Sequence, residues 1–182
     1  MQVDRLLPLV EPGTAPASCE EILSALVQVL PDQNPTFQAL REAYSAPCDW
    51  QAAQTVPFSS ARKWSGASFP GRGSFVVGAS EFILKERFHL VQEAVAAHSN
   101  EGYRVLLLAY FPGEFPEKSL PPVVSPLALL LIRDKIREEA PKTLRYFAEE
   151  GVDLKVISGD NAITVANIAE KAGLPNAAHY VD

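Results

Sequence analysis

Cysteine and histidine, the usual ligands of structural metal sites, are scarce in this sequence. Cys19 and Cys48 are its only cysteines, and neither they nor the 3 histidines follow the spacing of a zinc site. A reducing, cytosolic setting is the simplest interpretation of so little cysteine, and a single disulfide between the two residues is the alternative. The sequence therefore predicts no metal site.

Long apolar runs are also missing. The longest run, residues 123–132, is interrupted by Ser125 and Pro126, and a helix needs about 20 apolar residues to cross a bilayer. The N-terminal stretch MQVDRLLPLVEPG places an acid and prolines too early for a signal peptide. We expect the chain as it stands to be soluble, which leaves open whether it is part of a membrane protein.

Clusters of lysine and arginine are absent, and the net charge is −6. Such a charge argues against a surface that binds the backbone of nucleic acid. The apolar fraction of 47% and the charged fraction of 21% are ordinary for a soluble globular protein. With 182 residues, the chain is long enough for one large domain or two small ones.

The pattern of elements divides the chain in two. In the first part, Ser18 followed by Glu21 is a capping box that begins a helix, and residues 70–73 form a tight hairpin loop. A proline-rich stretch, residues 111–126, is the best candidate for a boundary or hinge. The predicted helices of the first part cover residues 20–30, 37–44 and 86–99, and its predicted strands cover residues 3–10, 55–58, 64–69, 74–77 and 104–110.

Beyond the hinge, apolar strands alternate with helices. The order is a strand at 127–131, a helix at 138–150, a strand at 154–157 and a helix at 162–172, which is typical of a parallel sheet. We therefore predict an α+β domain with an antiparallel sheet over residues 1–124 and an incomplete Rossmann-like α/β segment over residues 125–182. Because two strands are too few for a parallel sheet of their own, the second segment is expected to be part of a larger domain.

The predicted turn between the last strand and the last helix contains Ser158, Gly159, Asp160 and Asn161. Ligands of open α/β sheets bind at the carboxyl ends of the strands, where a small hydroxyl and a helix N-terminus suit a phosphate oxygen. The alternative is that the turn only caps the helix. Asp134 follows the preceding strand and falls at the same edge, although a solvated charged loop is the ordinary interpretation of its surroundings.

Three stretches of the first part have the chemistry of a nucleotide site. Phe58 can stack on a base, and Lys63 can meet a phosphate. Gly78 and Ala79 follow a strand and allow a ligand to approach the backbone closely. The alternative is a turn from the strand into a helix, with the following serine as the helix cap. Arg104 begins a strand. Each stretch taken alone has an ordinary alternative to nucleotide binding. Phe58 is then a core residue, Lys63 belongs to a charged surface loop, and Arg104 is a surface residue.

In their order along the chain, these stretches resemble the cytoplasmic part of the P-type (E1-E2) cation-transporting ATPases. In that family a nucleotide-binding (N) domain is inserted into a haloacid-dehalogenase-like phosphorylation (P) domain. Three stretches match motifs of the N domain: residues 58–63 match Phe-Ser-x-x-Arg-Lys, residues 77–81 match Lys-Gly-Ala-x-Glu, and residues 102–106 match Gly-x-Arg-x-Leu. Residues 134–137 resemble the motif Asp-Pro-x-Arg at the hinge between the two domains. Residues 158–160 resemble Thr-Gly-Asp of the P domain. The resemblance covers nearly the whole chain and implies an N domain at 1–124 and part of a P domain at 125–182.

The resemblance also implies roles for individual residues and a need for ATP and Mg²⁺. Phe58 would stack on adenine, Lys63 would lie in the ATP pocket and Arg104 would reach the phosphates. The implied ATP-binding residues are Phe58, Lys63, Gly78, Ala79, Arg104 and Arg137. The implied catalytic residues of the P domain are Ser158, Gly159, Asp160 and Asp134, with Ser158 holding a phosphoryl oxygen.

Several positions depart from the family pattern. Val77 replaces the lysine of Lys-Gly-Ala, and Phe37 replaces the acid in residues 34–37, which resemble Asp-Pro-Thr-Glu. Lys135 replaces the hinge proline, and Ser158 replaces threonine but keeps the hydroxyl. These changes predict a weaker or differently built nucleotide pocket.

Neither Asp-Lys-Thr-Gly-Thr nor Gly-Asp-Gly-x-Asn-Asp occurs, so the aspartate that is phosphorylated and the main magnesium-binding acids are absent from this sequence. We expect an inactive fragment of an ATP-driven pump that uses an aspartyl-phosphate intermediate. Its implied partners are the remaining P, A and transmembrane domains, at the cytoplasmic face of a membrane. The lack of a His-Pro motif and of Cys-rich stretches disfavours heavy metals, and calcium or a magnesium-like cation is favoured.

Two other hypotheses remain open. In the first, the chain is a non-catalytic nucleotide-binding or regulatory module, which Val77 and Phe37 favour and the retained Phe58 disfavours. The second is a soluble haloacid-dehalogenase-type phosphatase. That enzyme needs Asp-x-Asp after its first strand, whereas Asp4 is the only early acid near a strand and no Asp-x-Asp occurs.

Overall fold

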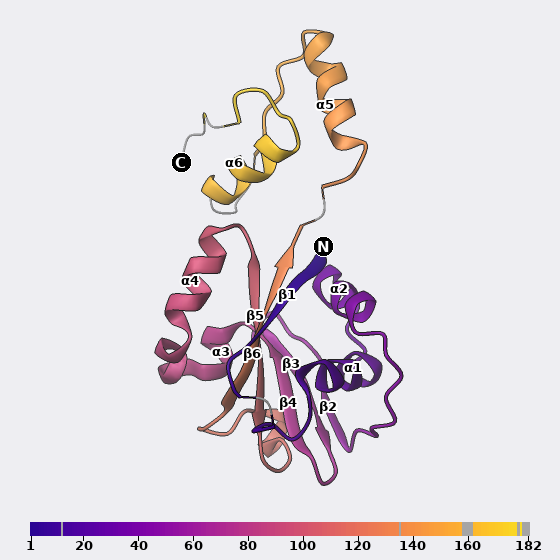
Figure 1. Ribbon diagram of the computed structural model, residues 1–182, viewed down its shortest axis with the longest axis vertical. Coiled ribbons are helices and arrows are strands. Elements are labelled where there is room, and N and C mark those ends of the chain that lie inside the picture. Colours follow the sequence, from indigo (N-terminus) through magenta and orange to yellow (C-terminus); the bar gives the residue numbers. More distant parts are fainter. Residues whose placement is uncertain (12, 135, 158–161, 178, 180–182) are drawn as a thin grey trace.

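A six-stranded antiparallel sheet lies at the centre of the fold, with the strand order β1-β6-β5-β4-β3-β2 (Figure 1). The structure is a computed structural model that describes residues 1–182 except 12, 135, 158–161, 178 and 180–182. The strands are β1 (Gln2–Pro8), β2 (Gln54–Val56), β3 (Trp64–Phe69), β4 (Gly73–Gly78), β5 (Arg104–Phe111) and β6 (Ser125–Arg133). The antiparallel α+β architecture predicted for the first part of the chain is confirmed.

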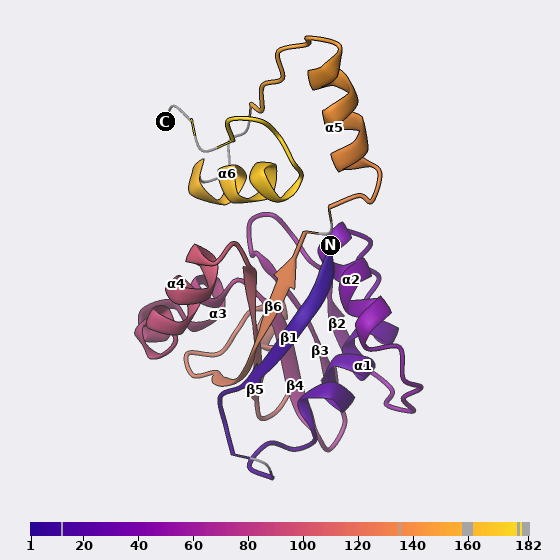
Figure 2. The ribbon, with the colours of Figure 1, turned by 45° about the horizontal axis from the view of Figure 1, so that its top comes forward.

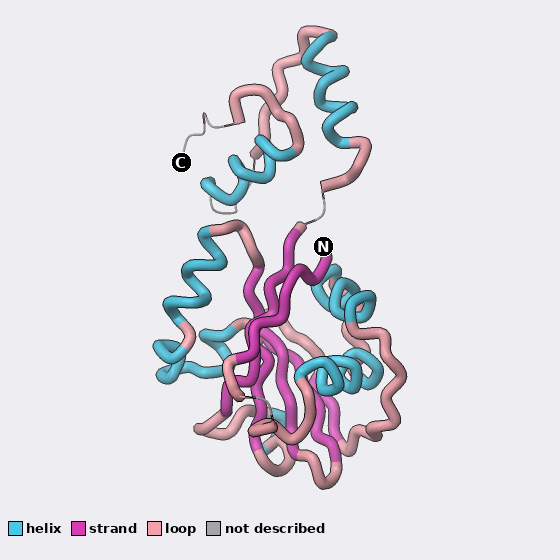
Figure 3. The backbone as a smooth tube through the Cα atoms, viewed as in Figure 1, coloured by secondary structure: helices cyan, strands magenta, loops and turns pink. Residues whose placement is uncertain are grey.

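Two helices, α1 (Cys19–Val29) and α2 (Pro35–Ala43), cover one face of the sheet (Figures 1 and 3). Their starts follow the local sequence: Ser18 Oγ accepts the Glu21 N–H at 3.2 Å, and Asn34 Oδ1 accepts the Phe37 N–H at 2.9 Å. The apolar stripe of α1 is buried against inward-facing side chains of β3, β4, β5 and β6. Cys19 and Cys48 both remain free thiols, so the alternative of a disulfide between them is wrong.

The opposite face is covered by α3 (Ser80–Leu84), the 3-10 helix η1 (Lys85–Leu90) and α4 (Gln92–Asn100) (Figures 1 and 2). The single helix predicted over residues 86–99 is therefore wrong in its first half. Val91 interrupts it with φ −126° and ψ −2°, and the Val91 side chain is buried in the core of this face. Tertiary burial of one valine thus overrides the local preference for a continuous helix.

The direction of β6 corrects the prediction of a parallel sheet after the hinge. Leu130 of β6 lies opposite Leu6 of β1 on one side and Leu106 of β5 on the other, and both pairings are antiparallel. The continuous apolar run of β6 arises because the strand is covered on both faces. Such a run indicates burial and contains no information about strand direction. The domain division at residue 124 stays a prediction, but the strand that follows it belongs to the central sheet.

Residues 152–157 form no strand, contrary to the prediction for 154–157. Val152, Val156 and Ile157 are 47%, 55% and 97% exposed. A strand needs a neighbour for its backbone hydrogen bonds, and the described part of the chain offers none here. The helices α5 (Ala140–Glu149) and α6 (Ala162–Lys171) form as predicted and lie beyond the end of the sheet where β6 ends (Figure 2). None of the helices described is both long and apolar enough to span a membrane.

A polar cluster around Tyr103 joins the ends of β1, β5 and β6. The Tyr103 hydroxyl donates to Asp4 Oδ2 at 2.9 Å and accepts from Arg5 Nη2 at 3.2 Å and from Arg133 Nη2. Both guanidinium groups also lie over the Tyr103 ring, at 5.5 Å and 4.7 Å from its centroid. The hydrogen bond to Tyr103 is the main cause that raises the pKa of Arg5 above its ordinary value.

Replacing Tyr103 with phenylalanine should test this cluster. The variant keeps the ring but leaves Asp4 and the two arginines without the hydroxyl, so we expect a loss of about 1–2 kcal/mol in the free energy of unfolding. Urea denaturation measures the change. Tyr146→Phe is the matched control, because the Tyr146 side chain is 57% exposed, and it should change stability by less than about 0.5 kcal/mol. Equal effects of the two variants would contradict a structural role for the cluster.

Candidate functional site

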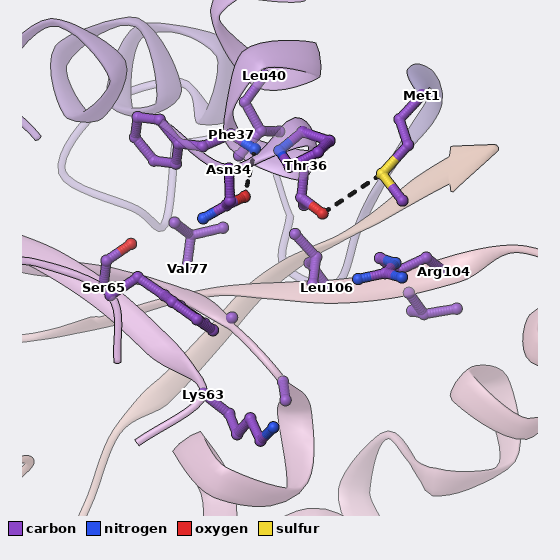
Figure 4. A pocket seen from close by; sticks show the side chains of 15 residues that line it. Met1, Asn34, Thr36, Phe37, Leu40, Lys63, Ser65, Val77, Arg104 and Leu106 are labelled. Carbon is purple, nitrogen blue, oxygen red and sulfur yellow. Dashed lines mark hydrogen bonds between the residues drawn. The ribbon is translucent and has the colours of Figure 1, made fainter. Parts of the chain in front are cut away.

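A cavity of about 490 Å³ opens between α2 and the ends of β3, β4 and β5 (Figure 4). Its volume lies within the range of about 300–1,000 Å³ that is usual for small-molecule sites. The residues that line it are Met1, Asn34, Pro35, Thr36, Phe37, Leu40, Phe58, Lys63, Ser65, Val77, Gly78, Ala79, Arg104, Val105 and Leu106.

Five residues that the sequence proposes for ATP binding lie together in this lining. They are Phe58, Lys63, Gly78, Ala79 and Arg104. They come from the loop before β3, from the end of β4 and from the start of β5. The fold thus brings together three stretches that are separated along the chain, and their predicted role in binding stays to be tested.

The other predicted residues are not part of the cavity. Asp134 and Arg137 are exposed beyond the end of β6 and do not line it. Ser158, Gly159 and Asp160 lie outside the residues that the structure describes. The phosphate-binding role of these residues stays a prediction, although the two strands predicted to carry them form no second sheet in the described part of the chain.

Local hydrogen bonds shape the loop that contains Phe58 and Lys63. Ser59 Oγ accepts the Arg62 N–H at 3.1 Å, and the Ser59 carbonyl accepts the Lys63 N–H at 2.8 Å. Lys63 adopts the left-handed conformation with φ 60°, and its carbonyl accepts the Ala79 N–H at 3.0 Å. The last bond joins two of the predicted stretches directly, so the loop and the end of β4 form one wall of the cavity.

Gly78 is required by the packing of the sheet itself. A Cβ atom at this position would lie 2.4 Å from the Lys63 carbonyl oxygen and 2.5 Å from Trp64 Cα. The close backbone approach that the sequence predicts at Gly78 is therefore made by the neighbouring strand β3. The serine cap offered as the alternative for this turn is wrong, because Ala79 is the N-cap of α3 and the buried Ser80 hydroxyl has no partner among the described residues.

The two substituted family positions occupy different places. Both line the cavity, but the Phe37 side chain is only 3% exposed and packs into the core between the helices and the sheet, with its ring centroid 5.0 Å from the Arg41 guanidinium. Figure 4 shows Phe37 on the side of the cavity away from Arg104. Beside Val77 lie the side chains of Asn34 and Ser65, neither of which the sequence proposed for ATP binding (Figure 4). Asn34 has the signal of a helix cap and belongs to the stretch that resembles Asp-Pro-Thr-Glu, whereas no sequence signal indicated Ser65.

The chemistry of the lining suits binding. Lys63 and Arg104 supply two cations, Phe58 supplies an aromatic ring that is 41% exposed, and much of the rest is apolar. Among the described residues of this lining, none is Asp, Glu, His or Cys, the groups that most often act as acids, bases or nucleophiles. The arrangement fits an anionic ligand that contains an aromatic group.

Comparison with known proteins adds an independent observation. No family profile matches the chain. It is 39% identical over 157 residues to the calcium-transporting ATPase CtpE of Mycobacterium tuberculosis, covering 86% of this chain and 20% of that protein. It is 39% identical over 186 residues to the probable cation-transporting ATPase exp7 of Streptococcus pneumoniae, covering 100% of this chain and 23% of that protein. A more distant match, 28% identical over 131 residues, is the plasma membrane calcium-transporting ATPase 1 of Mus musculus. The chain thus spans about a fifth of the length of the bacterial relatives.

Proposed function

Because the chain belongs to the P-type cation-transporting ATPases, we propose that its cavity binds the ATP that drives a cation pump. The chain corresponds to about a fifth of the length of its bacterial relatives. The main support is that Phe58, Lys63 and Arg104, from separate stretches of the sequence, line one cavity of about 490 Å³. An aromatic ring and two cations are the groups that a nucleotide needs, one for its base and the others for its phosphates.

The proposed binding mode assigns one part of ATP to each group. The Phe58 ring stacks on adenine, since its face is partly exposed and base stacking does not depend on polar contacts. Lys63 and Arg104 pair with the phosphates, and the backbone at Gly78 and Ala79 forms the wall between them. Mg²⁺ would neutralise phosphate charge when bound, and the described lining has no carboxylate that would hold it.

In the whole pump, we propose that this segment presents the γ-phosphate to an aspartate that lies elsewhere in the protein. Phosphoryl transfer needs positioning and charge neutralisation. Ser158, Gly159, Asp160 and Asp134 would organise the P-domain edge, with Ser158 holding a phosphoryl oxygen, and Arg137 would reach the nucleotide across the hinge. The partners would be the remaining P, A and transmembrane domains, with this segment at the cytoplasmic face of the membrane. The names of the relatives support calcium as the transported cation.

Calorimetric titration of the chain with ATP, ADP and AMP tests the proposal. We expect weak binding of ATP, and neither turnover nor phosphoenzyme, because the sequence contains no Asp-Lys-Thr-Gly-Thr. A chain that binds none of the three nucleotides would instead support the regulatory alternative. Turnover of ATP that Asp160→Asn leaves unchanged would contradict the assignment altogether.

Replacing Lys63 with methionine should separate the phosphate end of the site from the base end. We expect ATP affinity to fall about tenfold, because a hydrogen bond to a charged group contributes about 1.5–3 kcal/mol, and AMP affinity to fall less. Added salt should weaken ATP binding by the unmodified chain more than by the variant.

The matched control for Lys63→Met is Lys85→Met. Lys85 also has a positive φ, 51°, but it does not line the cavity. The control should bind ATP as the unmodified chain does. If both variants lose affinity to the same extent, Lys63 has no specific role in phosphate binding.

A further inference from the structure

Charged side chains hold both ends of the peptide unit that precedes Phe58. The Phe58 N–H donates to Asp32 Oδ1 at 2.8 Å, and the Pro57 carbonyl accepts from Arg62 Nη2 at 2.7 Å. Asp32 belongs to the loop between α1 and α2, whereas Arg62 belongs to the same loop as Phe58. A carboxylate at the N–H and a guanidinium at the carbonyl both match the dipole of the peptide unit, and charge-assisted hydrogen bonds are the strong ones.

Asp32 is unusually buried for a charged residue, whereas the hydrogen bond from Arg62 to the Pro57 carbonyl is exposed. Asp32 is 8% exposed, and its second oxygen, Oδ2, is buried without a hydrogen-bond partner among the described residues. Arg62 Nε is likewise buried and without a partner in the described part of the chain. Burying a charge that is only partly satisfied destabilises a fold. Stability alone therefore gives no account of a carboxylate at position 32, and the hydrogen bond to Phe58 is the contact that it does make.

The Phe58 ring needs its backbone to be held. At 41% exposed, the ring has too little packing to be fixed in direction by its neighbours. The backbone of residues 57–58, which Asp32 and Arg62 restrain, sets the direction of the Cα–Cβ bond from which the ring projects. Pre-organising a side chain in its binding conformation increases affinity, because less conformational freedom is lost when the ligand binds.

We propose that Asp32, assisted by Arg62, is a positioning residue for ligand binding, which clamps the Pro57–Phe58 peptide and presents the Phe58 ring to the base. Neither Asp32 nor Arg62 lines the cavity. The inference rests on the proposed function of that cavity as a nucleotide site.

Asp32→Ala and Asp32→Asn test the clamp in the full chain. Calorimetry should show that Asp32→Ala binds ATP about fivefold to tenfold more weakly, with a smaller loss for inorganic tripolyphosphate, which has no base to stack. Asp32→Asn should restore most of the affinity, because its amide oxygen accepts the same N–H. Asp49→Ala is the control for loss of one negative charge, since Asp49 is exposed and outside the cavity lining, and it should bind as the unmodified chain does.

Two further measurements distinguish positioning from a general loss of structure. Amide hydrogen exchange at Phe58 should become faster in Asp32→Ala and stay slow in Asp32→Asn, while the urea midpoint reports global stability. In a Phe58→Ala background, Asp32→Ala should cause no further loss of ATP affinity, because residues that act through one another are not additive. If Asp32→Ala does not fold, Arg62→Met removes the other hydrogen bond of the clamp and should reproduce the selective loss for ATP.

The possible failures lead to different conclusions. Absence of ATP binding by the unmodified chain would overturn the proposed function and, with it, the positioning role. Two results would overturn the positioning role alone. The first is normal ATP binding by both Asp32→Ala and Arg62→Met. The second is a loss of ATP affinity in these variants that adds fully to the loss in Phe58→Ala.

Discussion

Replacing Phe58 with alanine is expected to weaken ATP binding by this chain about tenfold to a hundredfold, because stacking of a base on an aromatic side chain contributes about 1–3 kcal/mol. The ring lines the cavity and is 41% exposed, so its removal leaves no void in the core. The free energy of unfolding should therefore change by less than about 0.5 kcal/mol. Affinity for inorganic tripolyphosphate should be nearly unchanged.

Calorimetry with ATP and tripolyphosphate measures this effect. Phe58→Trp should retain ATP binding, since it keeps an aromatic face at the same place. Phe82→Ala is the matched control, because Phe82 is 40% exposed but lies on α3, outside the cavity lining. Unchanged ATP affinity in Phe58→Ala, or an equal loss in Phe82→Ala, would contradict the assignment of the base to Phe58.

Replacing Gly78 with alanine is expected to lower the free energy of unfolding by about 2–3 kcal/mol, the upper part of the range for overpacking a core. The added Cβ would lie 2.4 Å from the Lys63 carbonyl oxygen and 2.5 Å from Trp64 Cα, and both are backbone atoms that no side-chain rotation can move away. Relief requires β3 and β4 to separate at this pair. Because Lys63 is at the contact, ATP affinity should fall together with stability.

Urea denaturation and ATP calorimetry of Gly78→Ala test both consequences. Gly71→Ala is the control, because Gly71 has φ +73° but nothing within 4 Å of an added Cβ. It should lose only about 1 kcal/mol, the lower end of the range for a left-handed backbone, and bind ATP normally. A Gly78→Ala variant as stable as Gly71→Ala would show that the two strands yield easily at this point.

Features with a local cause were predictable from the sequence. The α1 start at Ser18 depends on a hydrogen bond to Glu21, only three residues away. The hairpin between β3 and β4 depends on glycines with positive φ, Gly71 and Gly73. The order of short motifs also predicted Phe58, Lys63 and Arg104 as residues of one site, and all three line the same cavity.

The errors share a physical origin in contacts that are distant along the chain. The apolar run at residues 127–131 indicated a buried strand, but its antiparallel direction depends on where β1 and β5 lie. The shorter run at residues 154–157, which contains Lys155, forms no strand, and no neighbour pairs with it in the described part of the chain. Val91 interrupts a helical pattern since its side chain packs into the core.

The sequence by itself determined the amphipathic helices, the central strands, the turn glycines and the chemistry of the site, because these depend on neighbouring residues or on residue type alone. Only the tertiary structure decided strand direction, the close approach of β3 to Gly78 and the contact between Asp32 and Phe58. Asp32 illustrates the reason: it lies 26 residues before Phe58, in a loop without a recognisable motif. Its role follows from the packing of two loops against each other, which no local pattern of residues encodes.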